Sequence, residues 1–212
     1  MAGEGGFQVP IFELPAVILP GELMPLHIFE ERYKRMIDHC LDSEEPFGIV
    51  FRDEDGSARR VGCTARITEV TETFDDGRMN VVVTGEEPFK VLDRFEAEEY
   101  PSGEIEPIDL GAEDPTENAG KDADLAREAF ADLVERVSGE APEGQDLADD
   151  DAYAIAARVE LPAETKQRLL ELRSEPERMK VLGNALRALV DAVDRSQEVA
   201  ERARMNGKVI VG

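Results

Sequence analysis

The fold class of this chain follows from one stretch, residues 61–84, which reads VGCTARITEVTETFDDGRMNVVVT. Apolar and polar residues alternate on both sides of an Asp-Asp-Gly sequence at residues 75–77. Alternation with a period of two is typical of half-buried strands, and a glycine-containing turn between two such runs predicts a β-hairpin. The alternation changes phase at Val70, which indicates a β-bulge.

The rest of the N-terminal half has the same character. Further short apolar runs, interrupted by proline and glycine, occupy residues 7–19, 47–51, 89–92 and 100–108. Pro10 and Pro15 limit the first run to an edge or bulged strand. Between the first two runs, apolar residues recur every three or four positions from Phe29 to Leu41, which predicts one helix. Strands this short and bent favour a small β-barrel over residues 7–110.

Beyond residue 120 the apolar period changes from two to about 3.6, which predicts helices. The sequence Ser174-Glu175-Pro176-Glu177 is a capping box that opens a long last helix. We therefore expect an α+β fold with a flexible N-terminus at 1–6, the barrel with its one helix at 7–110, a linker at 111–120, an α-helical bundle at 121–206 and a tail at 207–212.

The net charge of the chain limits the partners that it can bind. It has 48 acidic and 24 basic residues in 212, a formal net charge of −24. A field of this sign repels phosphate backbones, so nucleic acid and anionic membranes are unlikely partners. The acidic surface suits either a high-salt cytosol or an ordinary acidic protein. No secretory signal is visible and the apolar runs are far too short to span a bilayer, so we expect a cytoplasmic protein.

Candidate catalytic residues are few. The chain has two cysteines, Cys40 and Cys63, and two histidines, His27 and His39. No phosphate-binding loop, nucleophile elbow or zinc-protease motif occurs. A Cys63–His27 nucleophile pair stays open, but neighbouring residues supply nothing to activate it. We expect no enzyme activity, no cofactor and no metal.

A specific family resemblance begins in residues 14–33, LPAVILPGELMPLHIFEERY. This stretch resembles the entry of the N-terminal, substrate-binding domain of Lon proteases. The likeness continues through residues 46–50, 61–67 and 83–91. It implies a pseudobarrel like that of RNA-binding PUA domains, followed by a helical bundle. No motif of the Lon ATPase or peptidase domains is present, so the resemblance implies the stand-alone form of this domain.

The resemblance implies a module that binds unfolded or tagged polypeptides and self-associates, without catalysis. Such a module is expected to act as an adaptor that partners a protease or chaperone, and its last helix is expected to mediate a homodimer. We expect apolar protein segments to bind at six residues of the proline-rich entry: Leu23, Met24, Pro25, Leu26, His27 and Phe29. An extended segment added to an exposed strand edge is a second mode of the same binding.

Two alternatives belong to other classes of protein. The first is a PUA-like RNA- or nucleotide-binding module, with Arg59, Arg60, Arg66 and Arg78 forming a local basic patch near Phe51 or Phe74. The second is a small enzyme that uses an unrecognised carboxylate or Cys63.

Overall fold

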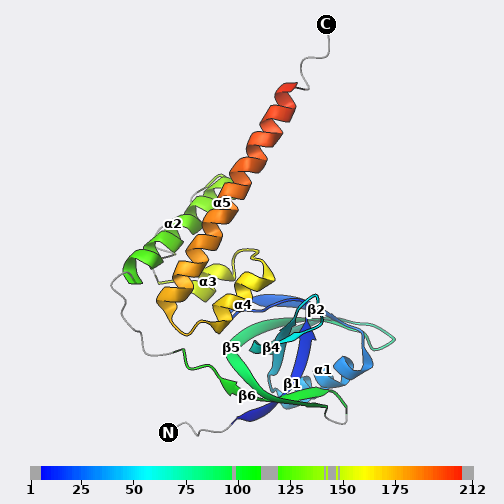
Figure 1. The fold of residues 1–212 in the computed structure, drawn as a ribbon. Helices are drawn as coiled ribbons and strands as arrows, with labels where there is room; N and C mark the ends of the chain where they lie inside the picture. Colours follow the sequence, from blue (N-terminus) through cyan, green and yellow to red (C-terminus); the bar gives the residue numbers. More distant parts are fainter. Residues whose placement is uncertain are drawn as a thin grey trace. The chain divides into compact units, whose positions relative to one another are not determined.

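The structure is a computed structural model that describes residues 6–96, 99–110, 119–140, 142, 147 and 149–206 (Figure 1). These residues form six strands and five helices, which confirms the mixed α+β class. In chain order they are β1 (Phe7–Leu14), β2 (Leu23–Ile28), α1 (Glu31–Ser43), β3 (Phe47–Arg52), β4 (Ala58–Thr73), β5 (Met79–Glu96), β6 (Pro101–Pro107), α2 (Ala119–Ser138), α3 (Ala152–Ala156), α4 (Ala163–Glu171) and α5 (Glu175–Asn206).

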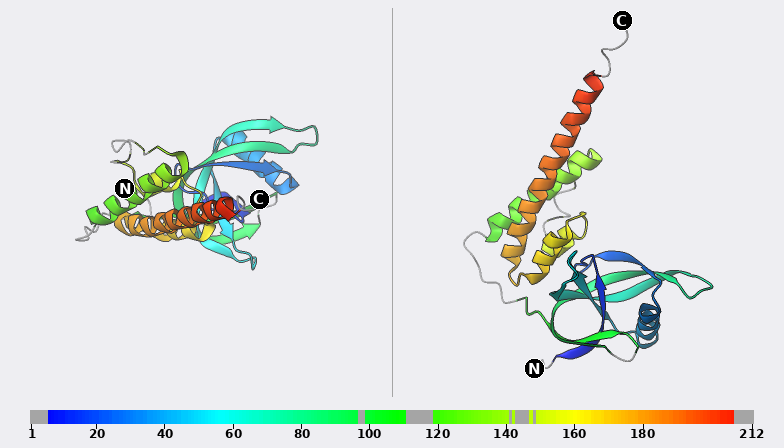
Figure 2. Two further views of the ribbon diagram at one scale, coloured as in Figure 1. Left: turned by 90° about the horizontal axis from the view of Figure 1, so that it is seen from above. Right: turned by 45° about the vertical axis from the view of Figure 1, so that its right-hand side comes forward.

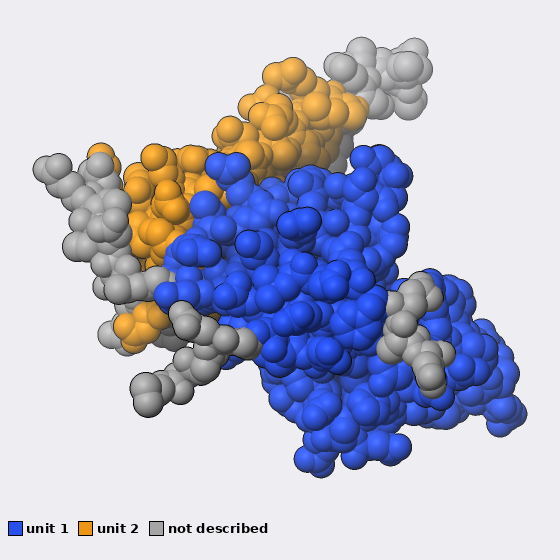
Figure 3. Space-filling model, turned by 60° about the horizontal axis from the view of Figure 1, so that its bottom comes forward, with its two compact units in different colours: residues 1–112, 156–173 blue, residues 113–155, 174–212 orange. Residues whose placement is uncertain are grey.

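The chain divides into two compact units (Figure 3). Unit 1 comprises residues 1–112 and 156–173, and unit 2 comprises residues 113–155 and 174–212. The predicted domain boundaries stay a prediction; the compact units differ from them because α4 groups with the strands. Three predicted segments fall mostly outside the described residues: the N-terminus at 1–6, the linker at 111–120 and the tail at 207–212.

The six strands of unit 1 form one sheet in the order β2-β5-β4-β3-β1-β6. The long strand β5 also pairs with β6, so five strands close into a ring and β2 lies outside it (Figures 1 and 2). The predicted hairpin is confirmed as β4 and β5, with Gly77 at φ 78° in the turn. Its register shifts on both sides of Val70, as the change of phase predicts. The likeness of this ring to a PUA pseudobarrel stays a prediction.

Strand β1 differs from the expectation. It pairs with β6 through Phe7–Pro10 and with β3 through Ile11–Leu14, so it has neighbours on both sides. Of the two predicted alternatives, an edge or a bulged strand, the edge does not hold for the strand as a whole, although each half pairs on one side only. Pro10 lies just before the pairing with β3 begins, where a residue without an N–H costs no hydrogen bond to that strand.

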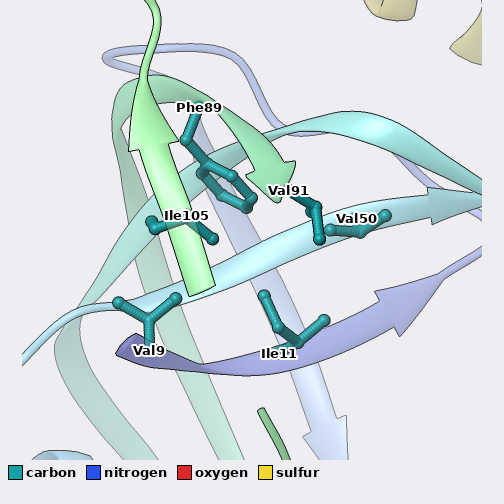
Figure 4. Close-up of a cluster of buried hydrophobic side chains, with 6 residues drawn as sticks. All are labelled: Val9, Ile11, Val50, Phe89, Val91 and Ile105. Carbon is teal, nitrogen blue, oxygen red and sulfur yellow. The ribbon is translucent and has the colours of Figure 1, made fainter. Parts of the chain in front are cut away.

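The ring is filled by a cluster of buried side chains, shown in Figure 4: Val9, Ile11, Val50, Phe89, Val91 and Ile105. The Phe89 ring fits only because two strand positions opposite it are glycine. A Cβ atom on Gly62 would lie 2.4 Å from the Ile49 carbonyl oxygen and 2.8 Å from Phe89 Cζ, and one on Gly48 would lie 2.7 Å from the same Cζ. Both distances to Phe89 are shorter than a van der Waals contact, so these glycines set the close approach.

Helix α4 joins unit 1 through polar contacts to the strands. Lys166 forms an ion pair with Glu22, and Gln167, which is 1% exposed, donates from Nε2 to the Val61 carbonyl oxygen at 3.2 Å. Glu164 accepts from Arg59 at 3.1 and 3.0 Å. These contacts explain why residues 156–173 belong to unit 1.

In unit 2, α2 and α5 lie side by side (Figures 1 and 2). Their contact is apolar, with Phe130 and Leu133 buried on α2 and Leu182 and Leu186 buried on α5. The predicted start of the last helix is confirmed, because the Ser174 carbonyl accepts the first helical hydrogen bond from Arg178 N at 3.0 Å. The assignment of these helices as a bundle stays a prediction. None of the described helices is both long and apolar enough to cross a membrane.

Candidate functional site

The predicted binding residues lie on and just after β2. Burial alternates along this strand: Leu23, Pro25 and His27 are exposed, whereas Met24 and Leu26 are half-buried. Leu23 is 64% exposed and Phe29 is 60% exposed, so these two place large apolar side chains in solvent. Leu23, Pro25 and His27 thus share one exposed face of the strand, and the pleat turns the other two predicted residues, Met24 and Leu26, to the opposite face.

The helix predicted from Phe29 begins two residues later, at Glu31. Its apolar stripe is Tyr33, Met36, Ile37 and Cys40, all buried. Phe29, which is 60% exposed, is not part of this buried stripe. Phe29 fits the helical period only by coincidence, because it lies between β2 and α1 and the backbone of the next residue, Glu30, is still extended.

The open side of β2 carries backbone groups without a strand partner. Among the described residues β2 pairs only with β5, and Gly85 N donates to the Glu22 carbonyl at 3.0 Å just before the strand begins. Antiparallel hydrogen bonds alternate from residue to residue. Continuing this alternation turns the backbone groups of Leu23, Pro25 and His27 away from β5. Since proline has no N–H, the open side offers N–H donors at Leu23 and His27 and a carbonyl at all three positions.

An aromatic cluster holds Phe29 beside this edge. The His27 ring stacks on Phe29 with centroids 6.0 Å apart and meets the edge of Phe74 at 6.1 Å. His27 Nδ1 lies 2.6 Å from Asn80 Oδ1, a hydrogen bond to the residue paired with it on β5. These contacts hold the His27 ring, and Phe29, which is 60% exposed, stacks against it.

A cavity of about 690 Å³ opens within unit 1 next to Phe29. The end of β1, the end of β2 and the start of α1 line it, together with Arg52, Arg94 and Phe95. Its aromatic wall includes Phe29, Phe95 and Tyr33. No sequence motif connects Arg52, Arg94 and Phe95, and only the closure of the ring brings them together.

Two arginines of this cavity contact the same carboxylate, Glu13, whose side chain is 17% exposed. Arg52 Nη2 bonds Glu13 Oε2, and Arg94 Nη1 lies 3.5 Å from Glu13 Oε1. Glu30 and Arg32 also line the cavity and pair with each other at 2.9 Å, so the two carboxylates and three guanidinium groups leave one net positive charge on the wall. Close by, burial raises the pKa of Tyr33, whose ring lies 4.1 Å from that of Phe12.

The cysteines lie in the core. Cys63 is fully buried and donates from Sγ to the Thr64 carbonyl at 3.4 Å, while burial raises its pKa. Burial also raises the pKa of Cys40 to about 11. A thiol held neutral in this way is a poor nucleophile, so the Cys63–His27 pair gains no support.

Three of the four arginines named for an RNA site contact carboxylates. Arg59 Nε lies 3.1 Å from Asp53, Arg66 Nε lies 2.6 Å from Glu86 and Arg78 Nε lies 2.7 Å from Asp76. These acids offset the charge that phosphate groups require, so the basic patch gains no support either.

Comparison with known proteins identifies the family. The family model described as the ATP-dependent protease La (LON) substrate-binding domain matches residues 8–188. The chain belongs to this family, as the resemblance in residues 14–33 predicts.

The similar full-length proteins are much longer than this chain. It is 22% identical over 215 residues to a Lon protease of Paraburkholderia phytofirmans and 27% identical over 229 residues to a Lon protease of Anaeromyxobacter dehalogenans. These alignments cover 92% and 96% of this chain but 26% and 25% of the relatives. The chain thus spans about a quarter of the length of the curated relatives it matches.

Two solved structures share its fold. One is a Lon N-terminal domain protein from Xanthomonas campestris, with a TM-score of 0.60 and 21% identity over 83% of this chain and 96% of that one. The other is the N-terminal domain of a Mycobacterium avium complex Lon protease, with a TM-score of 0.66 and 20% identity over 85% of this chain and 98% of that one. Both comparisons support the α+β architecture of a Lon N-terminal domain.

Proposed function

We propose that this chain is a non-catalytic module that binds unfolded polypeptides at the open edge of β2. The membership of a substrate-binding family supports the kind of ligand. The observation that carries the site is the combination of an unpaired strand edge with two solvent-exposed apolar side chains, Leu23 and Phe29.

The proposed binding mode is the addition of an extended segment as a short strand. Its backbone bonds to the open groups of Leu23, Pro25 and His27, and its alternate side chains pack on Leu23 and Phe29. Backbone pairing does not depend on sequence, whereas burial of apolar side chains does. This mode therefore favours exposed apolar segments of any client. Folded proteins bind poorly in this mode because their backbone hydrogen-bonding groups and apolar side chains are already buried.

Pro25 limits this pairing. Exposed edges are aggregation hazards, and a proline on the edge blunts them because it removes a donor. With donors only at Leu23 and His27, the edge holds a short segment and does not template a long sheet. Weak, reversible binding is what an adaptor for many clients requires.

A binding measurement with matched variants tests this proposal. The probe is a fluorescein-labelled ten-residue peptide of alternating valine and serine, acetylated and amidated so that charge plays no part, and the readout is fluorescence anisotropy. We expect a dissociation constant on the order of tens of micromolar, weakened at least about tenfold in Leu23→Ser/Phe29→Ser because two large side chains no longer contribute to apolar burial.

The matched control is Leu41→Ser/Val137→Ser, which removes two exposed apolar side chains on α1 and α2, 38% and 72% exposed. It should bind the peptide as the original chain does. The proposal is wrong if the original chain does not bind at one hundred micromolar, or if the control loses as much affinity as the β2 variant.

The proposal also includes protein partners of this chain. Family membership supports association with a protease, and we propose an adaptor role toward a protease or chaperone in the cytoplasm. We also propose that α5, where Val199 is exposed, contributes to a homodimer. Sedimentation over micromolar concentrations tests the dimer, and a monomer throughout would contradict it.

A further inference from the structure

We infer that the cavity beside Phe29 binds a carboxylate that stands next to an apolar side chain on the bound polypeptide. This inference rests on the proposed function, because it names the chemistry of the segment that the β2 edge presents. It adds a second, charged site to the apolar one.

The charge on the cavity wall is the first reason. Glu13 offsets only one of the two guanidinium groups of Arg52 and Arg94 that contact it. In a chain with a net charge of −24, this is a place where positive charge exceeds negative charge at short range. A carboxylate placed there completes the pairing, because the second guanidinium gains a partner.

The second reason is that both guanidinium groups keep hydrogen-bond donors. Arg52 uses Nη1 for the Gly56 carbonyl and Nη2 for Glu13, and Arg94 uses Nη2 for the Arg59 carbonyl. Each arginine has five N–H groups, so donors remain on both after these bonds. The bonds also fix the two side chains, which are 48% and 34% exposed, so little order is lost when an anion binds.

The third reason is the composition of the rest of the wall. Phe29 and Phe95 line the same cavity, and both are partly exposed, at 60% and 36%. A volume of about 690 Å³ is ample for one aromatic or large aliphatic side chain together with its carboxylate. Phe29 follows β2 directly, so a segment paired along the edge reaches the cavity with its next residue.

Two sources supply this chemistry: the C-terminal carboxylate of a polypeptide, or an Asp or Glu side chain within it. The first test uses small probes that isolate the cavity from the edge. N-acetyl-phenylalanine and N-acetyl-phenylalaninamide differ only in the carboxylate, and each is titrated into the full ¹⁵N-labelled chain while amide and arginine Nε signals are followed by NMR.

We expect the acid to shift the signals of Phe29, Phe95, Arg52 and Arg94, and to bind at least about fivefold more tightly than the amide. Arg52→Gln/Arg94→Gln should abolish that difference. Arg66→Gln should keep it, since Arg66 is an equally exposed arginine of unit 1 that pairs with Glu86 and does not line the cavity. If the double variant does not fold, Arg94→Gln alone and the acid–amide comparison in the original chain decide the matter.

Equal binding of acid and amide, no shift at the cavity, or an equal loss in Arg66→Gln would overturn the inference. The valine–serine peptide with an amidated end reports the edge separately, so its binding survives if only this inference fails. Comparing that peptide with its free-acid form, and with an amidated form that carries one internal glutamate, then assigns the source: a gain in the first indicates the chain terminus, and a gain in the second the acidic side chain.

Discussion

Lys166 of α4 and Glu22, which immediately precedes β2, form an ion pair 144 residues apart in the sequence, and their side chains are only 12% and 13% exposed. Glu22 also accepts a hydrogen bond from Leu19 N at 3.0 Å. A single carboxylate therefore fixes both the entry of β2 and the position of α4. The start of the strand whose edge is proposed to bind polypeptides is therefore held in place by α4, a helix far from it in the sequence.

Removing one partner of this pair should cost much more than removing an exposed one. Lys166→Met leaves Glu22 largely buried without its cation, and we expect a loss of about 3 kcal/mol in the free energy of unfolding. Glu164→Gln removes the negative charge that Arg59 contacts; because Glu164 is 65% exposed, this should cost less than about 1 kcal/mol. Urea unfolding measures both, and equal losses would show that burial of the Lys166–Glu22 pair has no special role.

Gly62→Ala should destabilise the ring by about 2 kcal/mol or more. The added methyl group would lie 2.4 Å from the Ile49 carbonyl oxygen, a backbone atom that cannot rotate away. Gly120→Ala is the control, because no atom other than those of its chain neighbours and its own helix backbone lies within 4 Å of a Cβ there. Thermal unfolding compares them; a Gly62 variant as stable as the control would show that the strands are less tightly packed than described.

The stability of the fold should fall between pH 9 and pH 11. Burial raises the pKa of Cys40 from 9.0 to about 11, so in this interval the unfolded chain loses the proton first. The neutral thiol therefore stabilises the folded chain below pH 9, and this contribution is lost as the pH rises through the folded-state value. We expect a slope of roughly 1 kcal/mol per pH unit from this group. Cys40→Ser should show a shallower slope in urea unfolding across the interval, and an unchanged slope would contradict the assignment.

Pro25→Val should strengthen pairing at the β2 edge. The substitution restores an N–H donor on the open side and leaves the hydrogen bonds to β5 unchanged, because Pro25 does not face β5 in the alternation of the ladder. We expect tighter binding of the valine–serine peptide and concentration-dependent self-association in sedimentation. If neither changes, the open edge of β2 is not where segments pair.

Local patterns predict the elements of this fold well, but not which of them meet. The hairpin around Gly77, the bulge near Val70 and the start of α5 after Ser174 all depend on residues close in sequence, and all three are confirmed. Strand β2 is missed because Pro25 lowers its strand propensity and only the partner strand β5 supplies its hydrogen bonds.

The candidate site, likewise, is only partly predictable from local sequence patterns. Leu23 and Phe29 can be proposed from sequence because they lie in one contiguous family motif, whereas their exposure relative to Met24 and Leu26 comes from the structure. Glu13, Arg52 and Arg94 come from three different strands, and closure of the ring brings them to one cavity. No spacing along the chain encodes such a group.

Strand addition at β2 is tested most directly by amide hydrogen exchange, measured residue by residue with and without saturating valine–serine peptide. We expect the N–H groups of Leu23 and His27 to exchange at least about tenfold more slowly when the peptide is bound, because a new strand accepts their hydrogen bonds. The exchange rates of Met24 and Leu26 should change little, because their backbone N–H groups already point toward β5. Peptide binding with unchanged exchange at Leu23 and His27 would show that polypeptides do not pair with the β2 edge.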